Sequence, residues 1–369
     1  SRRGVPAYFR SFGEMDAERG KPVEEDTIFR IYSMTKPITS VALMMLFEEG
    51  HFQLNDPVSR FIPAWSDHQV WVEGSGDEMV TRACENKMTM KDLLCHTSGL
   101  TYGGLLWEVD LHPVDQVYQQ LDLSRGPGET TKSFIEKLAR VPLRYEPGTR
   151  WRYSLATDVC GCLVEIIAGQ SLPEFFRENL FVPLGMEDTG FSVSEDKQDR
   201  FAANYERKLD KKLRLIDDPA TSTYLEEPSF PSGGGGLVST TSDYARFCEM
   251  LRRGGELDGT RILGDRTIKL MYMNHLPAGA DLASVAMEGF TETAYEGIGF
   301  GLGFASTIDQ ISAGNISGGD YYWGGAASTI FWVDPVEDLF VIFMTQLMPS
   351  ATFNFRGQLK NIIYSSIEA

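Results

Sequence analysis

The most constraining feature of the sequence is a segment near its beginning that is apolar almost all round a helix. Residues 33–49 follow helical spacing as far as Gly50, which is a typical helix stop. The apolar side chains of this segment are Ile38, Val41, Ala42, Met44, Met45, Leu46 and Phe47. Because they cover most of the helix surface, the helix can be stable only when other elements surround it. We therefore expect it to lie in the centre of a large core.

Patterns typical of strands lie near the two ends of the chain. We expect one strand over residues 5–12 and three more over residues 297–304, 326–333 and 338–346. In the segment 297–304 every second residue is glycine, which would place the glycines on one face of the strand and allow very close packing there. Both ends of the chain are therefore expected to contribute to one sheet.

Helical patterns fill the middle of the chain and recur near its end. The expected helices are residues 88–94, 133–141, 155–168, 171–181, 240–253 and 353–367. From this order we predict a discontinuous sheet domain of residues 1–60 and 205–369, with residues 61–204 inserted as a mainly helical domain. The polar stretches 66–87 and 101–130 are expected to be loops over a pocket.

Three shorter signals fall between these elements. Residues 208–218 are highly charged and are expected to form an exposed hairpin. Ser232 is followed by four glycines, which predict a flexible turn. The helix after this turn is expected to begin with Thr241 or Ser242 as its cap.

The composition argues against several classes of partner. The 369 residues carry a formal net charge of −18, which would repel the phosphate backbone of nucleic acids. No apolar run approaches the roughly 20 residues that a membrane helix needs, so no membrane partner is expected. The five cysteines lack regular spacing and fit a reducing compartment, which leads us to expect a cytoplasmic protein. The five histidines are scattered, and no metal site is predicted.

Ser33 and Lys36 form the first candidate for catalytic chemistry. Serine is a weak nucleophile that needs a nearby base, and residues three apart share one face of a helix. The helix N-terminus offers free backbone N–H groups that could stabilise an oxyanion. An apolar surround would favour the neutral amine that acts as a base. This pattern is consistent with Ser33 as nucleophile and Lys36 as its base.

The spacing Ser-x-x-Lys occurs twice, so it is weak evidence when taken alone. The second copy runs from Ser194 to Lys197 and lies in a charged stretch with no apolar helix behind it. We interpret this copy as a solvated loop. Only the copy at Ser33 precedes a strongly apolar helix.

Two further segments could complete a site. Tyr153 follows a Glu-Pro-Gly-Thr turn, and a tyrosine hydroxyl near a lysine can pass a proton to a leaving group. The alternative is a buried structural tyrosine. The stretch from Trp323 to Ala327 reads Trp-Gly-Gly-Ala-Ala and is expected to enter a strand. Its glycines would let a backbone N–H approach a substrate carbonyl, and the alternative is a plain turn.

Taken together, the order and spacing of these segments resemble the serine hydrolase superfamily of class C β-lactamases, D-amino-acid peptidases and family VIII carboxylesterases. The resemblance extends over nearly the whole chain. Its motifs are Asp26-Thr-Ile-Phe-Arg30 before Ser33, Leu93-Leu-Cys-His-Thr-Ser-Gly-Leu100, Pro147-Gly-Thr-Arg-Trp-Arg-Tyr-Ser154, Pro183-Leu-Gly-Met186, and Phe331-Trp-Val-Asp-Pro335 with Phe343-Met-Thr-Gln346. The resemblance implies a β-lactamase/transpeptidase-like α/β fold, in which helices flank an antiparallel sheet and a mainly helical domain is inserted.

The resemblance also implies roles for individual residues. Ser33 would be the nucleophile, Lys36 its base and Tyr153 their proton partner. The backbone N–H groups of Ser33 and Ala326 would form the oxyanion hole. Neither a metal ion nor an organic cofactor is implied. The expected substrate-binding residues are Trp323, Gly324, Gly325, Leu155, Tyr102 and Trp107.

Two departures distinguish the chain from the β-lactamases that it resembles. Those enzymes carry Tyr-x-Asn where this chain has Leu155, and Lys-Thr-Gly where it has Trp323 followed by two glycines. Both changes replace polar groups that hold a β-lactam by apolar surface that suits an acyl or alcohol chain, as in the esterase branch. The sequence also lacks the Gly-x-Ser-x-Gly elbow of the α/β-hydrolases.

We therefore predict a serine carboxylesterase that hydrolyses short-chain carboxylic esters through a Ser33 acyl-enzyme, with at most weak side activity on β-lactams. The alternatives are a class C-like β-lactamase or D-amino-acid peptidase, an acyltransferase on the same scaffold, and a non-catalytic scaffold protein. The sequence carries no signal for an oligomeric state. Related proteins usually have a helix and a first strand before the point where this sequence starts, so we expect the sheet to lack its usual first strand.

Overall fold

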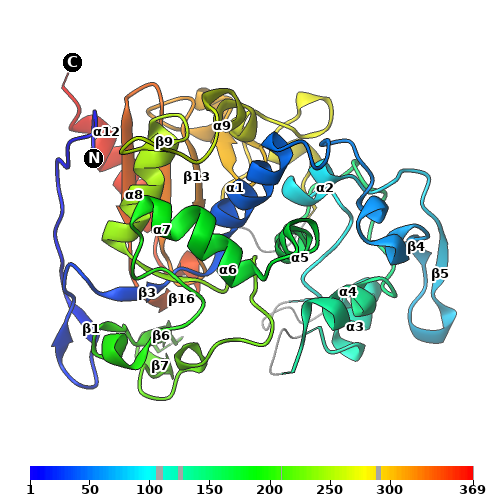
Figure 1. The fold of residues 1–369 in the computed structure, drawn as a ribbon, viewed down its shortest axis with the longest axis horizontal. Coiled ribbons are helices and arrows are strands. Elements are labelled where there is room, and N and C mark those ends of the chain that lie inside the picture. Colours follow the sequence, from blue (N-terminus) through cyan, green and yellow to red (C-terminus); the bar gives the residue numbers. More distant parts are fainter. Residues whose placement is uncertain (105–110, 124–127, 209, 288–291, 369) are drawn as a thin grey trace.

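The computed structural model describes residues 1–104, 111–123, 128–208, 210–287 and 292–368. Its centre is a five-stranded antiparallel sheet (Figure 1). In sheet order the strands are β11 (Ile298–Phe300), β12 (Ala305–Thr307), β13 (Tyr321–Gly324), β14 (Ile330–Asp334) and β15 (Leu339–Phe343). Each strand pairs with the next one along the chain, so the sheet is a meander.

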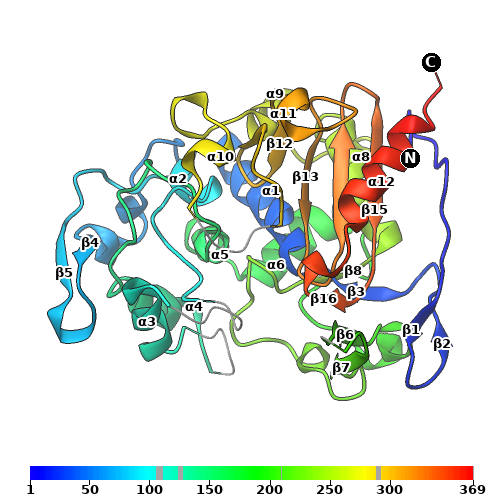
Figure 2. The same ribbon diagram turned by 180° about the vertical axis from the view of Figure 1, so that it is seen from behind.

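Helices cover both faces of this sheet. Helix α8 (Thr241–Arg252) packs on β14 and β15 on the face seen in Figure 1, and α12 (Phe355–Ser365) lies over the opposite face, seen in Figure 2. The alternation of side chains along β14 explains this arrangement. Phe331 contacts a tyrosine ring of α8 at 5.1 Å between centroids, and Trp332 contacts a tyrosine ring of α12 at 6.4 Å. The predicted antiparallel sheet flanked by helices is confirmed.

Helix α1 (Thr35–Glu48) runs between the sheet and the helical part of the chain (Figure 1). Its buried residues lie on all sides, and it packs against α5 (Ala156–Ala168). On the sheet side the close approach depends on Gly303, where an added Cβ would lie 2.2 Å from a serine hydroxyl of α1. The predicted central helix over residues 33–49 is confirmed, except that it begins with a 3₁₀ turn at Tyr32–Met34.

The middle of the chain is mainly helical, as predicted. Its helices are α2 (Met90–Leu94), α3 (Pro113–Gln120), α4 (Thr131–Leu138), α5, α6 (Leu172–Phe176) and α7 (Val182–Leu184), the last two joined by a π-helical turn at Arg177–Phe181. Helix α5 ends at Gly169 with φ 66°, and Ser171 caps α6 in a capping box with Glu174. The boundaries of an inserted domain at 61–204 stay a prediction.

Two stretches that the sequence predicts as loops contain regular structure. Residues 66–87 hold the antiparallel pair β4 (Gln69–Glu73) and β5 (Val80–Ala83), and residues 101–130 hold helix α3. Most side chains of β4 and β5 are exposed. Because Val70 alone among the side chains of β4 and β5 is buried, the hairpin has no apolar alternation in its sequence and its pattern resembles that of a loop.

Shorter strand pairs and helices connect the remaining segments. The pairs are β3 (Ile28–Arg30) with β8 (Val238–Thr240), β1 (Glu14–Asp16) with β2 (Lys21–Pro22), and β9 (Glu256–Leu257) with β10 (Thr260–Arg261). The helices are α9 (Asp265–Tyr272), α10 (Leu282–Val285) and α11 (Gln310–Ala313). The hairpin predicted over 208–218 is present as β6 (Asn204–Arg207) and β7 (Leu213–Asp217), and β16 (Leu347–Met348) adds a parallel strand to β6.

The strand predicted over residues 5–12 is wrong, since these residues, all of which the structure describes, form no strand. The apolar side chains of Val5, Tyr8 and Phe12 are exposed. Their spacing therefore does not mark a buried face. The residues before them pair with the start of β15, where the Phe340 N–H donates to the backbone carbonyl of the first residue at 3.0 Å. The absence of the usual first strand stays a prediction.

The glycine-rich segment 297–304 is a tight hairpin instead of a single strand. The chain reverses where the Gly301 N–H donates to the Phe304 carbonyl at 2.7 Å. The close packing expected of the glycines is present. An added Cβ on Gly299 would lie 2.7 Å from the Asn274 side chain, and one on Gly301 would lie 2.1 Å from a backbone carbonyl of α9.

Helix α8 is capped one residue earlier than the sequence analysis predicts. Its cap is Thr240, whose hydroxyl accepts a hydrogen bond from the Asp243 N–H at 3.1 Å, instead of Thr241 or Ser242. Thr240 is also the last residue of β8. The extended backbone that an N-cap needs therefore continues directly from the strand.

The described residues can be compared with two expectations from the composition, which concern a membrane-spanning helix and a metal site. No single helix among them is long and apolar enough to span a membrane, although α5 taken together with α6 and α7, across a bend of 82°, reaches that length and composition. No group of three or more His, Cys, Asp and Glu side chains in the same part of the chain is placed to hold a metal ion.

His68 makes the stability of the fold depend on pH. Its side chain is 8% exposed, and burial lowers its pKa from 6.5 to about 4. Between these two values the unfolded chain binds a proton that the folded chain does not bind. The free energy of unfolding should therefore fall as the pH drops through this window, by about 3 kcal/mol in total.

We expect His68→Phe to remove this part of the acid sensitivity, because phenylalanine keeps the ring contact with Trp65 and does not titrate. Urea unfolding of both proteins at pH 7 and pH 4.5 measures the effect. The wild type should lose more stability than the variant between the two pH values. Equal losses would contradict the prediction.

Candidate active site

Ser33 lies in the 3₁₀ turn that joins strand β3 to helix α1. The residue before it, Tyr32, has φ 42°, a left-handed conformation that is costly for a residue with a side chain. One helical turn further on, Lys36 is only 1% exposed, and its Nζ lies 3.4 Å from Ser33 Oγ. The structure therefore brings the predicted serine and lysine together on one face of the helix.

Tyr153 comes from the segment that precedes α5, and its ring lies beside the same lysine. Lys36 Nζ is 4.6 Å from the ring centroid. The Tyr153 hydroxyl hydrogen-bonds with the Ser33 side chain and accepts a hydrogen bond from Trp323 Nε1 at 3.2 Å. Burial raises the pKa of Tyr153 well above its ordinary value of 10, so the phenol keeps its proton at neutral pH. The three side chains predicted to be catalytic thus meet at one point.

The glycine-rich segment 232–236 supplies the closest partner of Lys36. The Gly234 carbonyl accepts a hydrogen bond from the lysine Nζ at 2.6 Å. The predicted turn is present at residues 233–235, and it is packed against α5. An added Cβ on Gly234 would lie 2.4 Å from Asp158 Oδ2, and one on Gly233 would lie 3.0 Å from a backbone carbonyl of α5. The glycines are needed here for close approach and not for flexibility.

Asp158 fixes this segment from the first turn of α5. Its buried carboxylate accepts hydrogen bonds from Ser232 Oγ at 2.5 Å and from the Gly234 N–H at 3.1 Å. The same glycine presents its carbonyl to Lys36, so a buried carboxylate orients the acceptor of the buried lysine amino group. Sequence reasoning missed Asp158. The signal that could have found it is a charged residue within an apolar helix, which needs a partner.

The two predicted oxyanion donors lie on adjoining segments. Ala326 is in the turn between β13 and β14, and the preceding Gly325 touches the segment before Ser33, where an added Cβ would lie 2.5 Å from the Ile31 carbonyl. Among hydrogen bonds between described residues, none uses the backbone N–H of Ser33 or of Ala326. The Trp-Gly-Gly segment leaves strand β13 instead of entering a strand, which corrects the prediction.

Two of the predicted lining residues lie beneath the site. Trp323 and Leu155 are 0% and 1% exposed. The Trp323 ring packs edge to face on Tyr153 at 5.2 Å, and the Leu155 N–H donates to the Thr101 carbonyl at 3.2 Å at the start of α5. The Trp323 side chain thus supports Tyr153 from the core. Their contact with a substrate stays a prediction.

Of the other predicted substrate-binding residues, three are described close to the catalytic side chains or to the serine turn, and one is not described. Tyr102 is half-buried, and its ring lies 5.2 Å from that of Tyr153 and 5.5 Å from Lys36 Nζ. Gly324 ends β13, and Gly325 follows it beside the serine turn. Their roles in substrate binding stay predictions, and Trp107 lies outside the described residues.

His96 is a buried neighbour of the site that sequence reasoning quoted only as part of a motif. Its ring packs edge to face on Tyr153 at 5.0 Å, and Nδ1 lies 3.1 Å from Ser154 Oγ. Burial, and then the charge of Lys36, hold the pKa of His96 well below its ordinary value of 6.5. The ring is therefore neutral at pH 7 and packs against the tyrosine as an uncharged neighbour.

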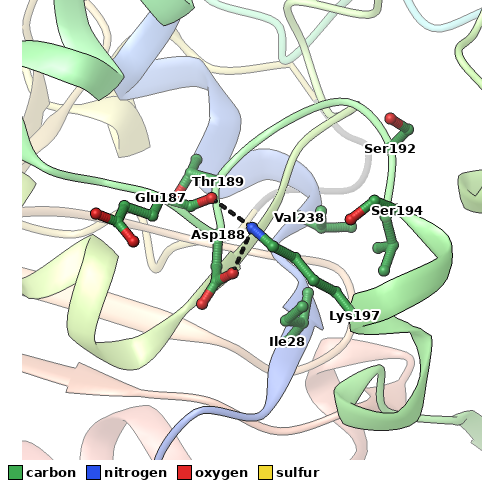
Figure 3. Close-up of a pocket in the computed structure, with 9 residues that line it drawn as sticks. Ile28, Glu187, Asp188, Thr189, Ser192, Ser194, Lys197 and Val238 are labelled. Atoms are coloured by element: carbon green, nitrogen blue, oxygen red, sulfur yellow. Dashed lines mark hydrogen bonds and ion pairs between the residues drawn. The ribbon is translucent and has the colours of Figure 1, made fainter.

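The second Ser-x-x-Lys copy belongs to a different, small pocket of about 120 Å³ (Figure 3). Lys197 Nζ forms an ion pair with Asp188 Oδ1 at 2.8 Å and donates to the Glu187 carbonyl at 2.7 Å. Its residues form a 3₁₀ helix over Glu195–Arg200, which has no buried residue. This agrees with the interpretation of Ser194 to Lys197 as a solvated segment, although it is helical and not a loop.

The chain is similar to known proteins in sequence and in fold. The family model described as Beta-lactamase matches residues 1–362 of the chain. The chain belongs to the beta-lactamase family. This confirms the resemblance drawn from the motifs and the β-lactamase/transpeptidase-like fold.

Relatives of this beta-lactamase family member include enzymes of two kinds. Esterase EstB of Burkholderia gladioli is 33% identical over 366 residues, which are 94% of this chain and 84% of EstB. The solved structure of EstCE1, described as a hydrolase with promiscuous acyltransferase activity, has a TM-score of 0.77 at 28% identity and covers 94% and 87% of the two chains. Simvastatin synthase (LovD) from Aspergillus terreus has a TM-score of 0.76 at 26% identity and covers 93% and 85%. The protein is thus a serine hydrolase of the β-lactamase fold.

The close packing of Gly234 gives a test of how Lys36 is held in this family member. We expect Gly234→Ala to slow the labelling of Ser33 by a fluorophosphonate at least about tenfold, because the added methyl group would displace the carbonyl that orients the lysine. Gly235→Ala is the matched control, since its Cβ would come no closer than 3.7 Å to another residue. The rate at which Ser33 is labelled is measured by mass spectrometry for both variants. Equal rates in the two variants would contradict the prediction.

Proposed function

We propose that this protein is a carboxylesterase that hydrolyses short-chain carboxylic esters through an acyl-enzyme on Ser33. The observation that carries the proposal is the meeting of the Ser33 hydroxyl with the buried amine of Lys36 and the buried hydroxyl of Tyr153. Serine, a base and a proton donor in mutual contact are what nucleophilic acyl transfer requires. The likeness to EstB, which is named an esterase, supports the same reaction.

In the acylation step, Ser33 Oγ attacks the carbonyl carbon of the ester and gives its proton to the neutral amine of Lys36. The carbonyl oxygen takes up the negative charge between the N–H groups of Ser33 and Ala326. The bond to the alcohol oxygen then breaks, and Tyr153, which is protonated at neutral pH, donates its proton to the leaving alkoxide. Lys36 returns the serine proton to the tyrosinate. The products of this step are the free alcohol and an acyl group on Ser33.

Deacylation uses the same groups with water in place of the alcohol. Water attacks the carbonyl carbon of the acyl-enzyme and gives a proton to Lys36, while the oxyanion again lies between the two N–H groups. The bond to Ser33 Oγ breaks, and Lys36 returns the proton to the serine. The carboxylic acid is released and the enzyme is restored. No metal ion or cofactor takes part in this scheme.

The surroundings of the site support neutral esters over β-lactams. At the two positions where β-lactamases carry polar groups, this chain has the buried side chains of Leu155 and Trp323. A nearby guanidinium, that of Arg356, is already paired with Glu292 at 2.6 Å. A substrate carboxylate would therefore compete with a carboxylate of the protein, whereas an uncharged acyl chain needs no such partner.

Acyl transfer to an alcohol is the second candidate function. It is favoured by the descriptions of EstCE1, a hydrolase with promiscuous acyltransferase activity, and of LovD, a simvastatin synthase. Hydrolysis and acyl transfer share the same acyl-enzyme. They differ only in whether water or an alcohol attacks it, so Ser33, Lys36 and Tyr153 would serve both reactions.

Hydrolysis of p-nitrophenyl butyrate by the wild type and by Ser33→Ala tests the primary proposal. We expect turnover by the wild type and background rates for the variant, because the attacking oxygen is lost. Tyr153→Phe keeps the ring beside Lys36 and removes only the hydroxyl, so it should lower kcat by about 10²- to 10⁴-fold. Ser194→Ala, in the second Ser-x-x-Lys copy, is the matched control and should retain wild-type activity.

Each outcome of this measurement has a definite meaning. An active Ser33→Ala variant would show that another residue is the nucleophile. A wild type without activity on any short-chain ester would overturn the esterase proposal.

Product analysis with an added acceptor separates hydrolysis from acyl transfer. With p-nitrophenyl butyrate and millimolar 1-butanol, we expect butyric acid to be the main product, because water is present at a far higher concentration than the alcohol. Gas chromatography measures the ratio of acid to butyl butyrate. If butyl butyrate dominates at millimolar alcohol, the acyltransferase function replaces hydrolysis as the better description.

A further inference from the structure

Arg356, in the first turn of α12, reaches the segment that carries the Ala326 N–H. Its Nη2 atom donates hydrogen bonds to the Gly325 carbonyl and to the Thr329 carbonyl, each at 3.1 Å. The guanidinium comes this close because Gly324 has no side chain, and an added Cβ there would lie 2.3 Å from Nη2. One arginine therefore joins both ends of the turn between β13 and β14.

Glu292 holds the guanidinium in this orientation. Its Oε2 accepts a hydrogen bond from Arg356 Nη2 at 2.6 Å, and its backbone carbonyl accepts one from Nη1 at 2.6 Å. The Glu292 side chain is 0% exposed. Burying an ion pair removes two charges from water and adds little net stability. Such a pair is better explained by what it positions than by stabilisation of the fold.

The Gly325 carbonyl and the Ala326 N–H belong to one planar peptide group. A cation that hydrogen-bonds to the carbonyl oxygen polarises the peptide and makes its N–H a stronger donor. We propose that Arg356 is a positioning residue that fixes and polarises the Gly325–Ala326 peptide, so that the Ala326 N–H stabilises the oxyanion of the reaction. Glu292 orients the Arg356 guanidinium by accepting hydrogen bonds from it. This inference rests on the proposed acyl-enzyme mechanism.

The other proposed oxyanion donor, the Ser33 N–H, also belongs to a peptide group whose carbonyl accepts a hydrogen bond. The Ser33 N–H shares its peptide group with the Tyr32 carbonyl, which accepts a hydrogen bond from the Thr35 N–H. The Gly325 carbonyl differs in that its donor is charged, and charge-assisted hydrogen bonds are about twice as strong as neutral ones. Arg356 therefore compensates for the position of Ala326 in a turn, outside any helix that could polarise its peptide.

Substitution of Arg356 tests this inference. Two quantities are measured for each variant: kcat/KM for p-nitrophenyl butyrate, and the inhibition constant of an alkyl trifluoromethyl ketone. The ketone adds to Ser33 Oγ and places an oxyanion where the ester would. We expect Arg356→Gln to lower kcat/KM and to weaken the inhibitor by the same factor, about tenfold. This loss is smaller than the 10²- to 10³-fold for a deleted donor, because the N–H remains.

Two milder variants keep the test valid if Arg356→Gln folds poorly. Arg356→Lys keeps the charge but cannot reach both carbonyls with one planar group, so it should be intermediate in both quantities. Glu292→Gln keeps an acceptor for the guanidinium and should also be intermediate. Parallel losses in kcat/KM and inhibitor affinity across the three variants are the expected result.

Arg252→Gln is the matched control for loss of a part-buried ion pair. Arg252 lies on α8, on the opposite face of the sheet, and pairs with Glu249 at 2.7 Å. We expect this variant to lower the thermal unfolding temperature without changing kcat/KM or the inhibition constant. If Arg356→Gln behaves in the same way, Arg356 only stabilises the fold and the inference is wrong.

The wild-type measurement separates the failure of this inference from failure of the proposed function. A wild type that hydrolyses no ester overturns the esterase proposal and the inference with it. A wild type that is active, together with an Arg356→Gln variant of unchanged kcat/KM and inhibitor affinity, overturns the inference alone.

Discussion

The burial of the Lys36 amino group is the constraint on which the arrangement of the site depends. A polar group taken out of water costs free energy unless well-placed partners compensate for it. Here the partners are the Gly234 carbonyl at 2.6 Å, the Ser33 hydroxyl and the ring of Tyr153. They come from three segments that are far apart in the sequence. The lysine is therefore satisfied only when the 232–236 segment, the central helix and the helical part of the chain have assembled around it.

Glycine residues let the segments around Lys36 pack closely enough to form the site. Gly303 lets the sheet approach α1, Gly234 lets the 232–236 segment approach α5, and Gly325 lets the β13–β14 turn approach the serine turn. In each case an added Cβ would lie within 2.5 Å of another residue. Backbone atoms can then reach the catalytic side chains directly. A larger residue at any of these positions would separate two elements that meet at the site.

The sequence could predict the features that depend on short-range spacing. The central helix, the Ser33–Lys36 pair and the family follow from periodicity, from an i, i+3 relation and from motifs, and the structure and the comparisons agree with them. The close packing of the segment 232–236 could not be predicted, because a glycine run has the same composition whether it is flexible or tightly packed. What decides between the two is Asp158, which is brought to the glycines only by the tertiary fold.

Backbone groups provide much of the electrostatic environment of this site. The Gly234 carbonyl accepts a hydrogen bond from the Lys36 amino group, and the N–H groups of Ser33 and Ala326 are the proposed donors to the oxyanion. Side chains such as Asp158 orient the backbone from behind and need not touch a substrate. The side chains that face the substrate can therefore change while the chemistry is kept. This gives a physical reason why a hydrolase at 28% identity and a synthase at 26% identity share one fold with this chain.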